Sequence, residues 1–282
     1  MKILPLCAVF IMAVIIYWFV AYSHQQEIIP SGKVVKIGII APLGGVNKNQ
    51  GILGVKGLEV AQQLRPYLND GASIEWVSIN DNNEPQQAVQ ALKILAEMPE
   101  IVAIVMFSGS DASLAVAKVA EQYRIPILMI LASHPDISTY GSFVNQFNFD
   151  DTFQAAVAAL YVRDELLIEK VAIVMQSGNS HFLYLANEFV RQFNSTEGLI
   201  TDRYDLQINE QDYLQILQSI QHKDPELLYL PVDMQQLFKI QMALQKLDWH
   251  PEIMVSDGIF EDIKMQKADS LTMVDKVLFI DA

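Results

Sequence analysis

The chain has 282 residues, enough for one large domain or two medium ones, each with its own core. It carries 19 Lys and Arg against 33 Asp and Glu, a formal charge of −14, and this argues against nucleic-acid binding, which needs clustered basic side chains. The one cysteine, Cys7, lies near the N-terminus, so disulfides and thiolate metal sites are excluded from the rest of the chain.

The N-terminal segment is a continuous apolar run. Residues 3–22 contain no charge, and twenty such residues can cross a hydrocarbon core of about 30 Å. Lys2 precedes the run, which predicts that the remainder lies outside the cytoplasm. We expect residues 1–26 to be a membrane anchor on the periplasmic or extracellular face of the cytoplasmic membrane. Cleavage as a signal peptide near Ser23 is the alternative, because Ala21-Tyr22-Ser23 fits a small-x-small site.

Beyond a polar linker, short apolar runs alternate with longer amphipathic segments. Strands are predicted at 34–41, 74–80, 102–107, 127–131, 143–149, 171–175, 227–230, 253–255 and 277–280, and helices at 51–69, 85–97, 112–123, 152–167, 182–193, 211–221 and 234–247. Strands that are apolar throughout and joined by helices indicate an α/β fold with doubly wound parallel sheets. Seven such units exceed one small sheet, so we predict two lobes, 33–149 and 150–282.

The loop after the third predicted strand is the first candidate site. It contains Ser108, Ser110 and Ser113 and opens a helix, where backbone N–H groups and short hydroxyls can hold a carboxylate or another anion. Simple capping of that helix by Ser110 or Asp111 is the alternative.

Two later loops also follow predicted strands at their carboxyl ends. Ala132, Ser133 and His134 follow the fourth strand, and Ser133 could offer a hydroxyl to a ligand or simply form a turn. Asp257 lies in Ser256-Asp257-Gly258, where an acid can pair with a ligand ammonium. The alternative for Asp257 is an Asp-Gly turn that needs the glycine.

Motifs of catalysis and of cofactor or metal binding are missing from the sequence. It has no nucleophile-elbow or zinc-protease motif, and its five histidines form no metal-like grouping. Gly51, Gly54 and Gly57 favour a close helix–sheet packing face over a phosphate loop, because no Gly-Lys-Ser/Thr ending follows. We therefore predict a binding protein without cofactor or metal, not an enzyme.

Several segments, taken in order, resemble a known family. They read KIGIIAPLGG, IEWVSINDNNEPQQAVQALKIL, IVAIVMFSGSDASLAVAKVAEQYRIPILMILAS, KVAIVMQSG, ELLYLPVD and EIMVSDG. Their order and spacing resemble the type I periplasmic binding fold, especially the branched-chain amino-acid (Leu/Ile/Val) binding proteins and related receptor ligand-binding regions. The resemblance implies two lobes that close on a small ligand, with an ABC permease or a sensor as the partner.

The resemblance also implies a set of ligand-binding residues. In the family, the serine loop and the turn after the next strand hold the ligand carboxylate. The acid of a later turn binds the ligand amino group, and one further position faces the ligand. The matching residues are Ser108, Ser110, Ser113, Ala132, Ser133, His134, Asp233 and Asp257.

The sequence departs from the family in two ways. The family's Tyr-Gly after the strand ending at Met175 is replaced by Ser180-His181, and an aromatic of the first loop is replaced around Gln50. A Leu or Ile ligand is thereby disfavoured relative to a more polar amino-acid-like solute.

Family members also run on past this point, so we expect a fold that lacks the family's usual C-terminal portion. A ligandless regulatory or scaffold domain is the alternative function.

Overall fold

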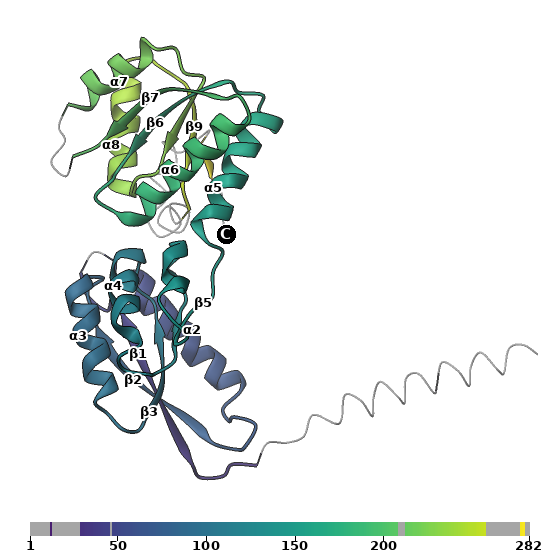
Figure 1. Ribbon diagram of the computed structural model, residues 1–282, viewed down its shortest axis with the longest axis vertical. Coiled ribbons are helices and arrows are strands. Elements are labelled where there is room, and N and C mark those ends of the chain that lie inside the picture. The colour runs from purple at the N-terminus through teal and green to yellow at the C-terminus, as the bar shows by residue number, and fades with distance from the viewer. Residues whose placement is uncertain (1–11, 13–28, 46, 208–211, 258–276, 280–282) are drawn as a thin grey trace, which may run out of the picture.

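The computed structural model describes residues 12, 29–45, 47–207, 212–257 and 277–279. They form two α/β lobes arranged one above the other, joined by the segment between β5 and α5 (Figure 1). Each lobe has a five-stranded sheet, and every strand pair in both sheets is parallel, as the sequence predicted.

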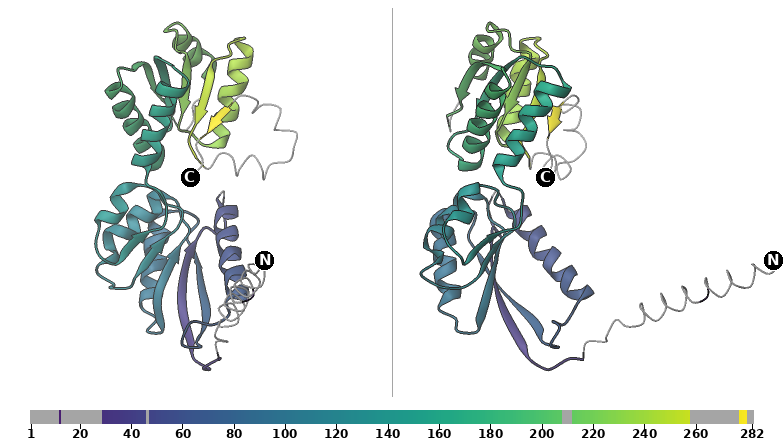
Figure 2. Two further views of the ribbon diagram at one scale, coloured as in Figure 1. Left: turned by 90° about the vertical axis from the view of Figure 1, so that its right-hand side faces the viewer. Right: turned by 45° about the vertical axis from the view of Figure 1, so that its right-hand side comes forward.

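The first lobe has the sheet order β2-β1-β3-β4-β5. Figure 2 shows α2 on one face of this sheet and α3 with α4 on the other. Its elements are β1 (Val34–Ala41), α2 (Lys48–Leu64), β2 (Ser73–Asn80), α3 (Pro85–Ala96), β3 (Ile101–Met106), α4 (Ser110–Ala120), β4 (Ile127–Met129), the 3₁₀ turn η1 (Pro135–Thr139) and β5 (Val144–Gln146).

The second lobe has the sheet order β10-β9-β8-β6-β7. Its elements are α5 (Asp151–Leu160), the π-helical turn η2 (Tyr161–Glu165), β6 (Lys170–Met175), α6 (Ser180–Ser195), β7 (Leu199–Asp205), α7 (Tyr213–Gln221), β8 (Leu227–Leu230), α8 (Met234–Lys246), β9 (Glu252–Val255) and β10 (Val277–Phe279).

The central strand β6 shows how the second lobe builds a core on each face of its sheet. Val171, Ile173 and Met175 pack against α5 and α6, whereas the alternate residues Ala172 and Val174 pack against α7 and α8. Successive strand side chains point to opposite faces, so a strand covered by helices on both sides must be apolar at every position.

The predicted strands and helices are found with shifts of a few residues, and one strand was missed. The missed strand is β7 (Leu199–Asp205), which lies at the edge of its sheet. Because an edge strand leaves part of its surface in water, β7 can contain two aspartates and an arginine. It therefore lacks the continuous apolar pattern of the other strands. The strand predicted at 143–149 is shorter, since pairing with β4 covers only Val144–Gln146.

Two of the three glycines predicted to pack closely do so. A Cβ atom on Gly51 would lie 2.2 Å from the carbonyl oxygen of Pro42, and one on Gly54 would lie 2.4 Å from the ring of Phe107. A Cβ atom on Gly57 would meet nothing within 4 Å, so the prediction is wrong there. Close packing of α2 on the sheet therefore depends on its first two glycines.

The predicted membrane anchor lies outside the described residues, except for Met12. Within the part of the chain that the structure describes, no helix combines the length and apolar character that a membrane span requires.

Candidate functional site

A polar cavity of about 300 Å³ lies where the carboxyl ends of the two sheets face each other. In parallel α/β sheets this is the edge where loops and helix N-termini converge on ligands. The cavity takes side chains from both lobes: Asn47, Gln50, Asn83, Gly109, Ser110, Leu131 and Ser133 from the first, and Gln176, Asn179, His181, Phe182, Val232, Asp233, Met234 and Asp257 from the second.

The first-lobe wall presents the start of α4. Its N-cap residue is Gly109, which has no side chain to satisfy the first N–H groups of the helix. The hydroxyl of Ser110 makes no hydrogen bond to any described residue and lies in the cavity wall. Asn83 Oδ1 accepts from the Gly109 N–H at 2.6 Å and fixes the loop. This wall therefore offers unused donors to a ligand.

Behind this wall, a buried carboxylate supports the serine loop. Asp81 is fully buried; its carboxylate accepts from the Ser108 hydroxyl at 2.5 Å and from the Asn83 N–H at 3.0 Å. Burial raises the pKa of Asp81, although these hydrogen bonds partly offset the rise. Ser113 is also buried, and its hydroxyl donates to the Ser108 carbonyl at 3.2 Å. Ser108 and Ser113 thus hold the loop in shape.

The second-lobe wall contains a histidine held between two carboxylates. His181, at the start of α6, places Nδ1 3.0 Å from Asp151 Oδ1 and Nε2 3.0 Å from Asp257 Oδ1. Asp151 is fully buried behind the ring, and Asp257 lines the cavity. Each ring nitrogen bonds to an ionised carboxylate only if it carries a hydrogen, so this geometry fits an imidazolium.

The surroundings of His181 stabilise its charged form. Burial by itself would lower the pKa of His181, but the hydrogen bonds and negative charges of Asp151 and Asp257 outweigh it and raise the pKa to about 10. Burial opposes the charge of Asp257 as well, yet the hydrogen bond and positive charge of His181 leave its pKa below the usual value. The Ser133 hydroxyl lies 3.2 Å from Nδ1, but an imidazolium cannot accept its proton, so this group is not a nucleophile–base pair.

Asp233 is the other acid in the cavity wall, and its partners are neutral. It caps α8 by accepting from the Gln236 N–H at 2.8 Å, and its second oxygen accepts from Gln176 Nε2 at 3.0 Å. Its side chain is half-buried.

Among the described residues, several contacts join the lobes beside the cavity, and one lies between backbones, where the Asp151 N–H donates to the Ser133 carbonyl at 2.9 Å. The Ser133 hydroxyl of the first lobe contacts His181, and Asp111 Oδ1 accepts from the Ser180 N–H at 3.2 Å. The rings of His134 and Tyr184 meet edge to face with centroids 4.9 Å apart. The chain itself thus supplies part of what holds the two walls together.

The structure gathers four of the eight predicted site residues around the cavity. Ser110, Ser133, Asp233 and Asp257 line it. The other four, Ser108, Ser113, Ala132 and His134, are buried and are not part of its lining. His134 accepts from the Asp136 N–H at 3.2 Å and packs on Tyr184.

His181 and Asp151 were not among the predicted site residues, although Ser180-His181 was noted as the replacement of the family's Tyr-Gly. Their positions, at the first turns of two helices that follow the interlobe segment and β6, were the available signal, but nothing in the sequence pairs them. The amide-bearing lining residues Gln176 and Asn179 were not predicted either.

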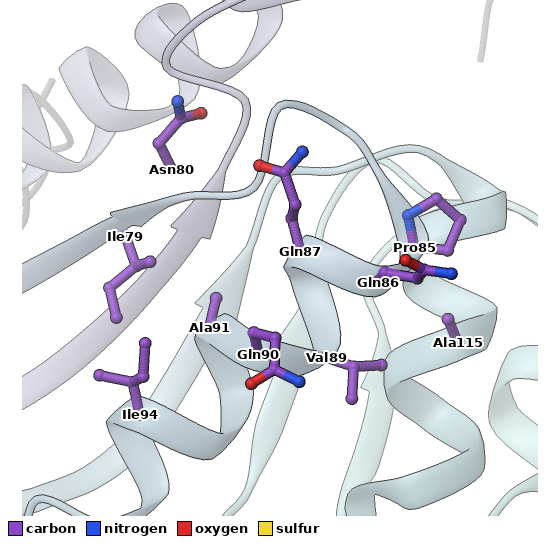
Figure 3. A pocket seen from close by; sticks show the side chains of 10 residues that line it. All are labelled: Ile79, Asn80, Pro85, Gln86, Gln87, Val89, Gln90, Ala91, Ile94 and Ala115. Atoms are coloured by element: carbon purple, nitrogen blue, oxygen red, sulfur yellow. The ribbon is translucent and has the colours of Figure 1, made fainter.

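A second hollow of about 650 Å³ lies on the surface of the first lobe, beside α3 (Figure 3). Its wall is formed by Ile79, Gln87, Gln90 and Ile94 with some neighbours, and none of its lining residues is ionisable. It is larger but takes residues from one lobe only, so the interlobe cavity is the stronger candidate.

Comparison with known proteins gives a family match over most of the chain. A profile described as "Periplasmic binding protein" matches residues 34–276. Among curated proteins, none matches the chain significantly.

Solved structures share the fold at low sequence identity. Leucine binding protein LivK from Thermotoga maritima has 23% identity and a TM-score of 0.77, with 87% of this chain and 69% of that chain covered. A solute binding protein of an ABC transporter from Rhodopseudomonas palustris, in complex with 3,4-dihydroxy benzoic acid, has 17% identity and a TM-score of 0.70, with 80% and 63% covered. LivJ from Streptococcus pneumoniae, in complex with isoleucine, has 21% identity and a TM-score of 0.72, with 80% and 65% covered. The chain thus spans about two thirds of the length of these proteins.

Proposed function

The chain belongs to the periplasmic binding protein family, and we propose that it is an extracytoplasmic solute-binding protein that closes its two lobes on a small polar ligand. The observation that carries this proposal is the polar cavity to which both lobes contribute side chains. A ligand that contacts both walls favours the closed arrangement over the open one, because it binds that arrangement more tightly.

The proposed ligand is an amino acid or a polar metabolite of similar size. A cavity of about 300 Å³ is at the small end of ligand pockets. The free donors at the start of α4 suit an acceptor group of the ligand, and the amides around the cavity suit its hydroxyl or carbonyl groups. The ligands in the structures of relatives, isoleucine and a hydroxylated benzoic acid, are of this size class.

The proposed partner is a membrane protein that recognises the closed state, either an ABC permease or a sensor. The matched structures include a solute binding protein of an ABC transporter and a branched-chain amino acid transporter substrate binding protein, which supports the permease. The apolar residues 3–22 would hold the binding lobes at the membrane, close to such a partner.

A ligandless scaffold is the second candidate function. The contacts of Ser133 with His181 and of Asp111 with Ser180 favour it, because they join the lobes without a ligand. A scaffold of this kind would stay closed whatever solute is added.

Thermal unfolding of the full chain in mild detergent, followed by tryptophan fluorescence, tests the proposal. A ligand that binds only the folded state raises the melting temperature with its concentration. Amino acids and small polar metabolites form the panel, and isothermal titration gives the affinity of any compound that raises the melting temperature.

Ser110→Ala should weaken that affinity roughly fivefold, the effect of losing one hydrogen bond. Ser138→Ala is the matched control, because Ser138 is exposed and its hydroxyl donates to the Pro135 carbonyl on η1. A well-folded chain that no solute stabilises would sink the solute-binding proposal and leave the scaffold.

A further inference from the structure

The charges around the cavity are unevenly balanced. Among the described residues, four carboxylates lie in or against the second-lobe wall: Asp233 and Asp257 in the cavity lining, Asp151 behind His181, and Asp111 beside the start of α6. His181 is the only basic side chain among the lining residues of the described cavity. These five groups therefore sum to −3 when all are ionised.

The single positive charge, on His181, is paired with two carboxylates on one side of the cavity. His181 donates one ring N–H to Asp151 and the other to Asp257, each over 3.0 Å. A ligand ammonium beside Asp257 would face this imidazolium at close range, where like charges repel. Asp257 thus has an internal counter-ion and little need of a cation from the ligand.

Among the residues that the structure describes, none is a counter-ion of this kind for Asp233. Both of its oxygens accept from neutral donors, the Gln236 N–H and the Gln176 amide, which leave its charge in place. Hydrogen bonds from neutral groups stabilise a carboxylate without neutralising it, so a cation that enters the cavity gains most beside Asp233.

We propose that the ligand carries a positively charged amine and that Asp233, not Asp257, receives it. This inference rests on the proposed solute-binding function and names the ligand class of the same cavity. It also changes the expectation from the family resemblance, in which the acid at Asp257 takes the amino group. The ligand's hydroxyl or carbonyl groups are left for Ser110 and the amide side chains of the wall.

Binding of four compounds that share one skeleton and differ in charge tests the proposal. Phenylalaninamide is a cation at about pH 6, phenyllactamide is neutral, phenylalanine is a zwitterion and phenyllactate is an anion. Isothermal titration of the full chain in detergent should show phenylalaninamide binding at least about tenfold more tightly than phenyllactamide. Phenyllactate should be the weakest ligand, and the alanine and lactate series serves as a smaller set.

Two isosteric variants locate the cation. Asp233→Asn should bring the ratio of the two amides close to one, because asparagine still caps α8 but carries no charge. Asp257→Asn should leave most of the ratio in place. Asp212→Asn is the matched control, since Asp212 caps α7 by accepting from the Gln215 N–H at 3.2 Å and is not among the lining residues.

Each outcome decides one claim. Equal affinities for the cationic and neutral amides would overturn the inference and leave the solute-binding function standing. A ratio lost in Asp257→Asn and kept in Asp233→Asn would do the same, because the amine would then lie at Asp257. If no compound of either series binds the folded wild-type chain, the proposed function falls and the inference falls with it.

Discussion

The two walls of the cavity differ in how the N–H groups at their helix N-termini are satisfied. In the first lobe, none of the helices α2, α3 and α4 has a side-chain N-cap hydrogen bond. In the second lobe, α5, α6, α7 and α8 are all capped by an Asp or Asn side chain. Helix N–H groups are thus left for a ligand on one side and satisfied internally on the other.

The acids of the two lobes differ in the same sense. Asp81 of the first lobe is buried behind the wall and is held by a hydroxyl and a backbone N–H. Asp257 of the second lobe lies in the wall and is held by a charged histidine. The first wall is therefore polar and nearly uncharged, whereas the second carries paired and unpaired charges. The proposed recognition of a charged ligand group therefore falls to the second lobe.

The largest expected effect comes from removing the histidine of the second wall. His181→Gln leaves Asp151 and Asp257 without their cation, and we expect the free energy of unfolding to fall by roughly 3 kcal/mol. Urea unfolding of the full chain in detergent measures this change. His222→Gln, on an exposed residue, should stay within about 0.5 kcal/mol of the wild type. A loss of similar size in both variants would show that the pairing of His181 is not special.

A rise in pH should produce the next largest effect. It removes one proton from the His181 imidazolium, but the other ring N–H remains, so less stability is lost than in His181→Gln. Below pH 6.5 the histidine is protonated in both the folded and unfolded chains, so the stabilisation is fully present. It is lost as the pH rises through about 10, the pKa in the folded chain. The melting temperature should therefore fall over this range.

The His181→Gln variant is the reference for that pH series. His181 contacts Asp151, Asp257 and the Ser133 hydroxyl. Burial and the charges of Asp257 and Asp151 raise the pKa of the nearby Tyr229 hydroxyl, so that group stays neutral over the pH series. A variant that loses stability with pH as steeply as the wild type would refute the role of His181.

Removing the Ser108 hydroxyl behind the first wall should lower the free energy of unfolding by a smaller amount. Ser108→Ala leaves one oxygen of the buried Asp81 carboxylate without its side-chain donor, at about 1–3 kcal/mol of unfolding free energy. Urea unfolding of the variant beside Ser138→Ala measures the difference. Because burial raises the pKa of Asp81, the loss should shrink at acidic pH, where the carboxyl group is neutral. A loss that does not depend on pH would contradict this account.

The smallest expected effect concerns the contact between the walls. Ser133→Ala removes one hydrogen-bond acceptor of His181 across the cavity, at about 1 kcal/mol. We expect the ligand-free chain to spend more time open, with a larger radius of gyration in small-angle X-ray scattering. Thr139→Ala, an exposed hydroxyl on η1, should leave the scattering unchanged. Identical scattering from both variants would show that this contact does not hold the lobes together.

Much of the fold was predictable because it depends on local pattern. Buried strands such as β1 and β8 are apolar at nearly every position, and the helices between them keep one apolar face, so both could be read directly. β7 escaped because an edge strand is only partly covered, and partial cover permits Asp202 and Arg203 within it. The serine loop and Asp257 were predicted as ligand-binding because both follow strands at their carboxyl ends, and Ser110 and Asp257 line the cavity.

The sequence by itself determined the two-lobed α/β architecture and the edge of each sheet at which a site would form. Only the tertiary structure decided which polar residues meet there. Asp151, His181 and Asp257 begin helices or follow strands in separate segments, and their pairing depends on how three α/β units pack side by side. Periodicity reports whether a residue is buried, but the state of its charge depends on neighbours that are distant in the chain, and these set the chemistry of the cavity.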